Sequence, residues 1–269
     1  MQKLEECIVT TAIPISKLLE NAKINTPNKY KIQDLPEWRD NLPIAIVGGG
    51  PSLKNTIGEL KDYKYIMVAG SAHDYVQEWA IKNDKKITFA VICDGDPVMQ
   101  TYLQNVTYPT KYLVASQCDP NLFKYLDRYD VYLWHSGGEG IDNISFGEGE
   151  LVLGGGVTVG TRAIAIALGM GFSDLHLYGF DNCLTSDYKH HAYDFNDPEK
   201  ETLGNIAEIQ LEEGGKKYAV AGYMLAQLFD FKKMLAMYSS RMKITIHGEG
   251  LLKDFMDIAY KKAIEVQNG

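Results

Sequence analysis

The sequence is poor in cysteine and lacks the paired cysteines that hold metals. Four cysteines occur among 269 residues, and no two of them form a Cys-x-x-Cys pair. This spacing suggests neither a zinc site nor a disulfide framework, so we expect free thiols in a reducing compartment. The four cysteines are Cys7, Cys93, Cys118 and Cys183.

Long apolar runs are also missing. No uninterrupted apolar stretch reaches the length of a membrane span, and the first six residues, Met-Gln-Lys-Leu-Glu-Glu, lack the basic-then-apolar pattern of a signal peptide. We therefore expect no membrane span and a cytoplasmic location. The sequence also contains no internal repeat and no low-complexity tract.

Positive charge is in deficit. The chain carries 27 Lys and Arg residues against 35 Asp and Glu residues, which gives a net charge of −8. This balance argues against broad binding to a nucleic-acid backbone, so no nucleic-acid partner is expected. An apolar content of 45% in a chain of this length is typical of one soluble α/β domain. The sequence favours an enzyme that acts on small molecules and leaves the oligomeric state open, a homo-oligomer included.

Apolar strands alternate with amphipathic stretches from residue 44 onward. This alternation of two-residue and 3.6-residue periods is typical of βαβ units. The predicted fold class is therefore α/β, a Rossmann-like, mostly parallel sheet flanked by helices. Strands are expected at 44–47, 65–69, 87–93, 111–115, 131–134, 175–178 and 243–247, and helices at 53–60, 74–82, 120–128, 158–168, 222–238 and 251–266.

Three segments depart from this alternation. Residues 1–40 are mixed in character and are expected to form an amino-terminal arm, with a short helix at 13–22, on a main domain of residues 41–269. Residues 135–156 are rich in glycine and acid and are expected to form a long loop near the site. Residues 183–220 are polar and aromatic, and we expect a flap insertion there.

The stretch Ile44–Leu53 contains the first glycine-rich turn. A short buried strand is followed by Gly48, Gly49 and Gly50, and then by Pro51 and Ser52 at the start of a helix. Proline suits a first helical turn, and the glycines leave room for a close approach of a ligand. Unpaired amides at such a helix start suit phosphate. The alternative is a plain glycine-rich turn between strand and helix.

Five groups of this kind follow predicted strands. In an open parallel sheet, ligands bind beyond the carboxyl ends of the strands. If the strands are parallel, all five groups lie along one edge, and their convergence is a stronger sign of a site than any one motif. The groups are Gly48–Ser52, Gly70 with Ser71, Asp94–Pro97, the turn formed by Gly154, Gly155, Gly156 and Thr158, and Gly179–Asp181.

The sharpest of these groups is the pair Asp94 and Asp96, which leaves a buried strand as Asp-Gly-Asp-Pro. Two carboxylates separated by one residue can hold Mg²⁺, which favours oxygen ligands and keeps waters or substrate phosphates as its others. Such an ion offsets charge when a phosphoryl group moves. The alternative is a polar turn, because Asp-Gly is a common turn dipeptide.

Three residues are candidates for acid–base or orienting roles. Asp181 follows a predicted strand and could bind a ribose hydroxyl, a ring amino group or the metal, or could simply cap a helix. His190 and His191 lie in the predicted flap, where one of them could act as a general base or could merely be exposed. Arg162, on a predicted small-residue helix, and Lys54, on the first helix, could each reach a phosphate or pair with an acid.

The order of these motifs resembles that of the MptE-like family. The resemblance rests on Gly-Gly-Gly-Pro-Ser-Leu at 48–53, Asp-Gly-Asp-Pro at 94–97, Gly-Gly-Gly-Val-Thr-Val at 154–159 and Tyr-Gly-Phe-Asp at 178–181. The family includes 6-hydroxymethyl-7,8-dihydropterin pyrophosphokinases and the core domain of flagellin glycosyltransferases. The first turn is also similar to the nucleotide-binding turn of CMP-sialic acid transferases, although those carry Gly-Asn-Gly where this chain has Gly48–Gly50.

The resemblance implies a nucleotide-dependent transferase whose partners are a nucleotide and a small-molecule acceptor. The first hypothesis is Mg²⁺-assisted transfer of pyrophosphate from ATP to a hydroxymethyl group, with Asp94 and Asp96 on the metal and the two glycine turns on the phosphates. The second is glycosyl transfer from a CMP-activated or other nucleotide sugar, with a flap histidine as base. The third is a nucleotide-binding protein without catalytic activity.

Overall fold

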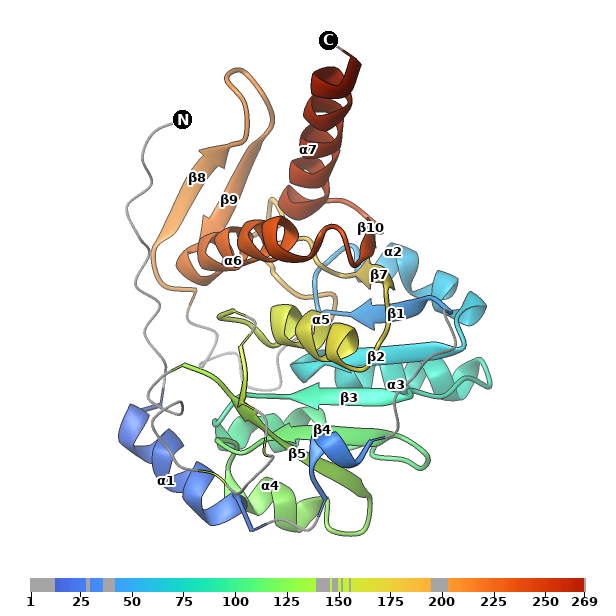
Figure 1. Ribbon diagram of the computed structural model, residues 1–269, viewed down its shortest axis with the longest axis vertical. Coiled ribbons are helices and arrows are strands. Elements are labelled where there is room, and N and C mark those ends of the chain that lie inside the picture. The colour runs from blue at the N-terminus through green and yellow to red at the C-terminus, as the bar shows by residue number, and fades with distance from the viewer. Residues whose placement is uncertain are drawn as a thin grey trace.

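The centre of the molecule is an eight-stranded sheet in which every paired strand is parallel to its neighbour (Figure 1). The computed structural model describes residues 13–27, 30–35, 42–138, 146, 150, 152–154, 156–194 and 203–268. The strand order is β10-β7-β1-β2-β3-β4-β5-β6. The strands are β1 (Ile44–Val47), β2 (Tyr65–Ala69), β3 (Phe89–Ile92), β4 (Lys111–Ala115), β5 (Asp130–Ser136), β6 (Val152–Leu153), β7 (Asp174–Tyr178) and β10 (Lys243–Ile246).

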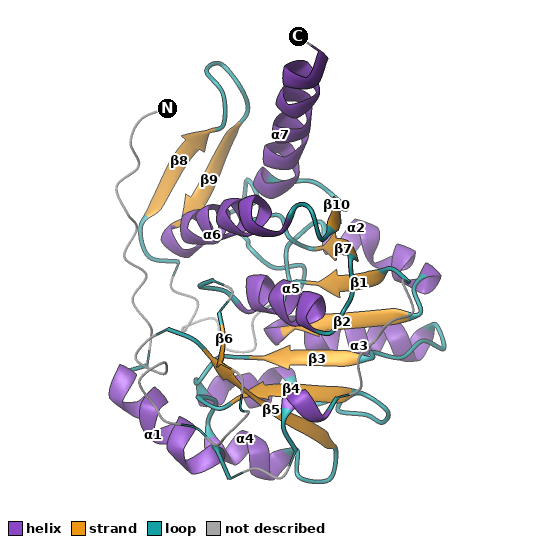
Figure 2. Ribbon diagram, in the orientation of Figure 1, coloured by secondary structure: helices purple, strands orange, loops and turns teal. Residues whose placement is uncertain are grey.

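Helices cover both faces of this sheet, and a separate two-stranded sheet stands at one end (Figure 2). The α-helices are α1 (Ile15–Asn25), α2 (Leu53–Thr56), α3 (His73–Lys82), α4 (Pro120–Tyr125), α5 (Val159–Gly169), α6 (Gly222–Tyr238) and α7 (Leu251–Asn268). The 3-10 helices are η1 (Ile32–Asp34), η2 (Ile57–Asp62), η3 (Gly70–Ala72) and η4 (Pro97–Tyr102). The α/β, Rossmann-like fold predicted from the sequence is therefore confirmed.

Two apolar cores lie on opposite faces of the sheet. Along β1, Ile44 and Ile46 belong to the core that α5 and α6 cover, whereas Ala45 and Val47 belong to the core under α2 and α3. Successive side chains of a strand point to opposite faces, so a strand in the middle of three layers must be apolar at every position. This requirement explains why β1 and β2 are uniformly buried.

Two predicted loops contain strands that the sequence pattern did not reveal. The segment 135–156 includes β6, which pairs with the end of β5 and extends the sheet. The segment 183–220 includes the antiparallel hairpin of β8 (Ile206–Gln210) and β9 (Lys217–Ala221). Strand β8 is mostly exposed, so its sequence lacks the apolar alternation by which a strand is recognised. The helix expected at 53–60 is also shorter, because α2 passes into η2 after Thr56.

The described part of the amino-terminal segment packs on the main domain. Leu18 and Ala22 of α1 are buried, and the Asn25 side chain donates hydrogen bonds to the carbonyls of Ser116 (2.9 Å) and Cys118 (2.8 Å). The expected helix at 13–22 thus begins and ends later, as α1. Buried amides of this kind fix the helix beside the carboxyl end of β4, and so bring it to the edge where the site lies.

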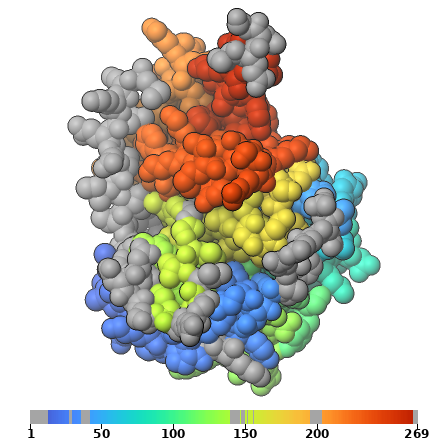
Figure 3. All heavy atoms as spheres, viewed as in Figure 1, coloured from blue at the N-terminus to red at the C-terminus, as the bar shows by residue number. Residues whose placement is uncertain are grey.

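Helix α6 lies beside α5 on the same face of the sheet, and the space-filling view shows the two helices next to each other (Figure 3). Hairpin β8–β9 and α7 extend from the same end of the molecule (Figure 1). None of the described helices is both long enough and apolar enough to cross a membrane.

Candidate functional site

The carboxyl ends of the parallel strands bring the predicted groups to one edge of the sheet. Gly48 follows β1, Gly70 follows β2, Asp94 lies two residues beyond β3, and Gly179 follows β7. The expectation that these groups share one edge is confirmed. Three cavities lie in a row along it, and each shares lining residues with the next.

The glycine turn after β1 pairs most of its amides within the protein. The Gly48 amide donates to the carbonyl of Tyr178 (2.8 Å), and the Gly50 amide donates to the carbonyl of Gly179 (2.8 Å). These bonds continue the pairing of β1 with β7 past the end of both strands. The expected row of amides open to a phosphate is therefore wrong for these two glycines, because the neighbouring strand already accepts from them.

Asp181 occupies the amino end of α2. Its carboxylate accepts from the Ser52 amide (2.7 Å) and from the Ser52 hydroxyl (2.6 Å), and its side chain is buried. Burial raises the pKa of Asp181 to about 6, although both bonds from Ser52 favour the ionised form. The alternative role weighed for Asp181, a cap on the helix, is thus the one that the contacts support. Pro51 has no amide hydrogen, so little of this turn remains open.

The flap lies directly on the glycine turn. The Ala192 amide donates to the Gly49 carbonyl (2.8 Å), and the Tyr193 hydroxyl hydrogen-bonds the Ser71 hydroxyl (2.7 Å). A β-carbon at Gly49 would lie 2.5 Å from Cδ2 of His191 and 2.5 Å from the Tyr193 hydroxyl. Glycine is therefore required at position 49 because the flap closes over it, which the sequence alone did not indicate.

His190 and His191 pack against each other beside the first glycine turn. Their ring centroids lie 4.1 Å apart in an edge-to-face contact, and Tyr223 of α6 lies 6.3 Å from His190. Burial lowers the pKa of His190 to about 4. Burial, together with the neighbouring His190, lowers the pKa of His191 to about 3. Both imidazoles are thus neutral near pH 7, and each can accept a proton or a hydrogen bond.

The histidines border a small cavity of about 160 Å³, the middle cavity. The first glycine turn, Ser71, the start of α5 and the inner face of α6 enclose it. Its lining residues are Gly48, Gly49, Gly50, Ala69, Ser71, Thr158, Val159, Gly160, Gly179, Phe180, Asn182, Cys183, His190, His191, Tyr223, Met224 and Gln227. Among the described residues, none accepts a hydrogen bond from the Gly49 amide, and Gly49 lines this cavity.

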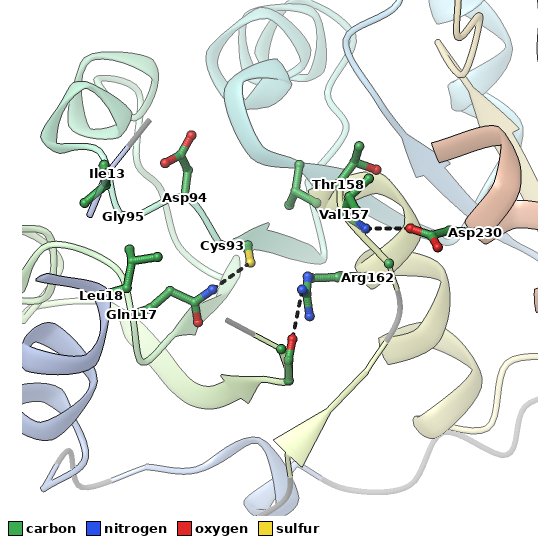
Figure 4. Close-up of a pocket in the computed structure, with 14 residues that line it drawn as sticks. Ile13, Leu18, Cys93, Asp94, Gly95, Gln117, Val157, Thr158, Arg162 and Asp230 are labelled. Atoms are coloured by element: carbon green, nitrogen blue, oxygen red, sulfur yellow. Dashed lines mark hydrogen bonds between the residues drawn. The ribbon is translucent and has the colours of Figure 1, made fainter. Parts of the chain in front are cut away.

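A larger cavity of about 620 Å³, the Arg162 cavity, lies on one side of the middle cavity (Figure 4). Thr158 and Val159, at the start of α5, line both. Figure 4 shows the Arg162 guanidinium extending from α5 into this space, with Asp94 and Gln117 on the facing walls.

A further cavity of about 650 Å³, the lysine-lined cavity, shares its lining residues Cys183 and His191 with the middle cavity. Its cations are Lys54, Lys189, Lys216 and Lys217, and Pro51, Ser52 and Asp181 also line it.

The second glycine turn is only partly at the site. Thr158 caps α5 by accepting from the Thr161 amide (3.3 Å), and Gly156 lies against Asp230 of α6. Gly154 lines a separate cavity between α5 and α6, and its place beside the phosphates stays a prediction. The preceding strand β6 has only two residues and runs parallel to β5. Gly155 lies outside the described residues.

Of the predicted pair Gly70 and Ser71, only Ser71 lines the middle cavity, and Gly70 packs against Val159.

Asp94 and Asp96 accept hydrogen bonds from different backbone amides. The Asp94 carboxylate lines the Arg162 cavity and accepts from the Asp96 amide (2.9 Å), whereas the Asp96 carboxylate accepts from the Val98 amide (2.8 Å) at the start of η4. Desolvation raises the pKa of Asp94 although its side chain keeps contact with solvent. Within the described ranges, no three His, Cys, Asp or Glu side chains are placed to hold a metal. A magnesium site at Asp94 stays a prediction.

Sequence reasoning missed several residues of the site. Asp230 accepts from the Val157 amide (2.9 Å) and joins α6 to the second turn. Gln117 follows β4, and Tyr193 and Tyr223 contact the histidines. The signal for Asp230 was a single carboxylate within the apolar run Leu-Phe-Asp-Phe of a helix assigned to the core. For Gln117 the signal was its place just beyond a strand.

Comparison with known families covers most of this site. A family described as 6-hydroxymethylpterin diphosphokinase MptE-like matches residues 16–187, well over half of the chain. The chain belongs to the MptE-like family. The match includes the first glycine turn, Asp94, Arg162 and Asp181, and ends just before the flap histidines. Comparison of the sequence with curated proteins finds no match.

A solved structure shares the fold of this MptE-like chain. The MAf glycosyltransferase from Magnetospirillum magneticum AMB-1 superposes with a TM-score of 0.66 at 17% identity, covering 90% of this chain and 38% of that one. The chain thus spans well under half of the length of that protein. A mammalian sialyltransferase in complex with Gal-beta-1-3GalNAc-ortho-nitrophenol superposes with a TM-score of 0.44 at 12% identity, covering 87% of this chain and 79% of that one.

Proposed function

We propose that this MptE-like chain is a transferase that takes its group from a nucleotide donor. The observation that carries the proposal is the row of three neighbouring cavities along the carboxyl edge, with the two histidines in the lining of the small middle one. A cavity of about 160 Å³ holds a phosphate and the reacting atoms but not two substrates. The two flanking cavities, each above 600 Å³, then supply one pocket for each substrate.

Charge favours glycosyl transfer as the reaction. The described charged side chains that line the middle cavity and the Arg162 cavity are Asp94, Arg162 and Asp230, and the histidines are neutral. The lysine-lined cavity adds four cations but also the four acids Asp181, Asp187, Glu208 and Glu249, so the three cavities together have no excess of positive charge to offset the several negative charges of a triphosphate. A sugar linked to a nucleoside monophosphate brings a single phosphate charge. A CMP-activated sugar is therefore the donor type that these residues accommodate most readily.

In this reaction an acceptor hydroxyl attacks the anomeric carbon of the sugar. The bond from that carbon to the phosphate oxygen breaks, and the phosphate leaves with the electron pair. The proton of the hydroxyl passes to the imidazole of His190 or His191, which is neutral and can accept it. A phosphate in the middle cavity would raise the pKa of both histidines, because a nearby anion favours imidazolium. The donor thereby strengthens the base that its own transfer needs.

Pyrophosphate transfer from ATP is the second candidate, and Asp94 is the observation that favours it. A carboxylate facing a large cavity suits Mg²⁺, which is commonly held by one or two carboxylates together with substrate phosphates. Asp94 would hold the ion, which would offset the charge of the triphosphate. The description of the matched family also supports this reaction.

Thermal shifts with CMP, CTP and ATP, each with Mg²⁺ and with EDTA, separate these functions. A specific ligand stabilises the folded state by mass action and so raises the melting temperature. At a hundredfold excess over Kd, the free energy of unfolding rises by about 2.7 kcal/mol. A CMP shift that survives EDTA supports glycosyl transfer, and release of CMP from a CMP-sugar then tests turnover. An ATP shift that EDTA abolishes, and that Asp94→Asn removes, supports pyrophosphate transfer. Absence of any shift would count against both and favour a non-catalytic role.

A further inference from the structure

Arg162 is a buried cation that no carboxylate neutralises within the described part of the chain. It lies in the first turns of α5 with 9% of its surface exposed. Its Nη1 donates to the carbonyl of Leu153 (3.3 Å) and its Nη2 to the carbonyl of Gly137 (3.1 Å). None of the ion pairs among the described residues includes it. Two carbonyl dipoles orient the guanidinium but leave its full charge uncompensated.

The guanidinium therefore has a charge and N–H donors that a bound anion would satisfy. It has five N–H donors in a planar fork, and two hydrogen bonds use only part of them. A charge that is removed from water and not paired is costly, so buried arginines normally face an anion. The two bonds to backbone also hold the fork in one orientation. A carboxylate or phosphate that enters the cavity can bind it through two parallel hydrogen bonds.

The opposite walls of the same cavity offer acceptors. Asp94 lines the cavity with a carboxylate of which one oxygen accepts from the Asp96 amide. Gln117 is 4% exposed; its Nε2 donates to the Cys93 sulfur (3.4 Å), and its Oε1 has no hydrogen-bond partner in the described part of the protein. Val157 and Leu18 supply apolar surface. A ligand that suits all of these groups carries an anionic group together with hydroxyl or amino groups.

We propose that the Arg162 cavity binds a hydroxylated acid, such as a sugar acid or a sugar phosphate. Arg162 binds its carboxylate or phosphate, and Asp94 accepts from one of its hydroxyl or amino groups. Thr158 and Val159 line both this cavity and the middle cavity, so the bound molecule lies next to the cavity that the histidines line. Its role as the group that gives or accepts the transferred unit, distinct from the donor phosphate, rests on the proposed function.

Matched pairs of small probes test this assignment by titration calorimetry in the presence of saturating CMP. Glucuronate and glucose 6-phosphate are each compared with glucose, and N-acetylneuraminate is compared with its methyl ester. We expect the charged member of at least one pair to bind at least tenfold more tightly than its neutral partner. The two charged glucose derivatives show whether a carboxylate or a phosphate is preferred.

Substitution of the arginine supplies the second arm. Arg162→Gln should weaken binding of the charged probe by roughly 10- to 100-fold, the effect typical of a hydrogen-bonded charge pair, and leave CMP affinity unchanged. Arg162→Lys keeps the charge without the fork and should retain an intermediate affinity. Arg128→Gln, at an exposed position beyond the end of α4, is the control for the loss of one positive charge.

Three outcomes would overturn the proposal. Equal binding of charged and neutral probes to the wild-type chain would show that the cavity does not select an anion, and this comparison needs no variant to fold. An equal loss of CMP affinity in Arg162→Gln would assign the arginine to the nucleotide phosphate. Unchanged probe binding in both arginine variants would leave Arg162 a structural role only. Failure of every nucleotide to bind while the charged probes still bind would instead contradict the proposed function alone.

Discussion

At the scale of single residues, the Asp181 carboxylate holds Ser52 at the start of α2. Its two oxygens hold the amide and hydroxyl of Ser52, and this contact joins the end of β7 to the start of α2. Because burial raises its pKa to about 6, the folded chain holds the Asp181 proton more tightly than the unfolded chain does. The stability of the protein must therefore depend on pH through this side chain.

We predict that Asp181 makes the free energy of unfolding fall as pH rises from about 4 to about 6. In this window the folded state binds more protons than the unfolded state, and above it the carboxylate is ionised in both. The total is at most about 3 kcal/mol, since one pKa unit is about 1.4 kcal/mol. Urea unfolding of the wild type and of Asp181→Asn from pH 4 to 8 measures it. The difference between the two should change below pH 6 and be constant above.

Asp181→Ala should behave differently from Asp181→Asn. It leaves the buried amide and hydroxyl of Ser52 without their acceptor, which costs about 2 to 3 kcal/mol. The asparagine side chain keeps an oxygen for the amide and an amino group for the hydroxyl. Equal stability of the two variants at pH 7 would show that the Ser52 contact contributes little.

We predict that substitutions of Asp94 and of Asp96 have different effects on stability and on Mg²⁺-dependent nucleotide binding. Asp96→Ala should lower stability by about 1 kcal/mol because it removes the cap of η4, and Asp96→Asn should not. Asp94→Asn should leave stability nearly unchanged and weaken Mg²⁺-dependent nucleotide binding if the second candidate function holds. Melting temperatures with and without Mg²⁺ and ATP measure both effects. A loss of metal dependence in Asp96→Asn alone would assign the ligand role to Asp96.

At the scale of elements, the flap and the first glycine turn form one closed unit. The chain from His190 to Tyr193 contacts Gly49 and Ser71, which lie beyond β1 and β2. Because His190 and His191 also line the middle cavity, these contacts fix one of its walls.

We predict that Gly49→Ala holds the flap open. The added methyl group would overlap His191 and the Tyr193 hydroxyl, and overpacking of this kind costs about 1 to 3 kcal/mol. Faster hydrogen exchange at 190–193 and weaker nucleotide binding should follow. Gly58→Ala in η2 is the matched control, because no atom lies within 4 Å of a β-carbon there. Similar exchange in both variants would show that the turn does not govern closure.

Acid should open the same unit. His190 and His191 have pKa values lowered to about 4 and about 3, so between these values and 6.5 the folded chain binds fewer protons than the unfolded chain. Stability from this source is complete above pH 6.5 and is lost as pH falls toward 4. The slope is opposite to that of Asp181, so the wild-type profile is a compromise between them. The double variant His190→Gln/His191→Gln should lose less stability than the wild type between pH 6.5 and 5, measured by urea unfolding.

At the scale of the whole molecule, one edge of a parallel sheet carries all three cavities. The opposite edge carries the short turns that lead into the strands, and it holds none of the predicted site groups. Ligand effects should therefore be polarised across the molecule.

Hydrogen exchange with saturating CMP should show this polarity. We predict protection at 48–53, 156–162, 190–193 and 222–227, and no change at 84–88 and 105–110 on the opposite edge. Binding slows exchange where amides lose access to open states, and distant segments follow only the small rise in global stability. Protection confined to the amino edge of the sheet would contradict the placement of the site.

Much of the fold could be predicted because its signals are local. Apolar runs such as 44–47 and 65–69 are strands because both faces are buried, and the intervening amphipathic stretches are helices. Hairpin β8–β9 was missed because its first strand is exposed and shows no apolar alternation. The position of Gly48, Ser71 and Asp94 along one edge could also be predicted, since parallel strands end on the same side.

The sequence by itself determined which residues follow the strands, because periodicity and turn chemistry act over a few neighbours. The tertiary structure alone decided what those residues contact. Ser52 and Asp181 are separated by 129 positions, and only the pairing of β1 with β7 brings them together. Likewise, the packing of α5 beside β6 leaves Arg162 buried without a carboxylate among the described residues, because partners at long sequence distance depend on sheet order and register.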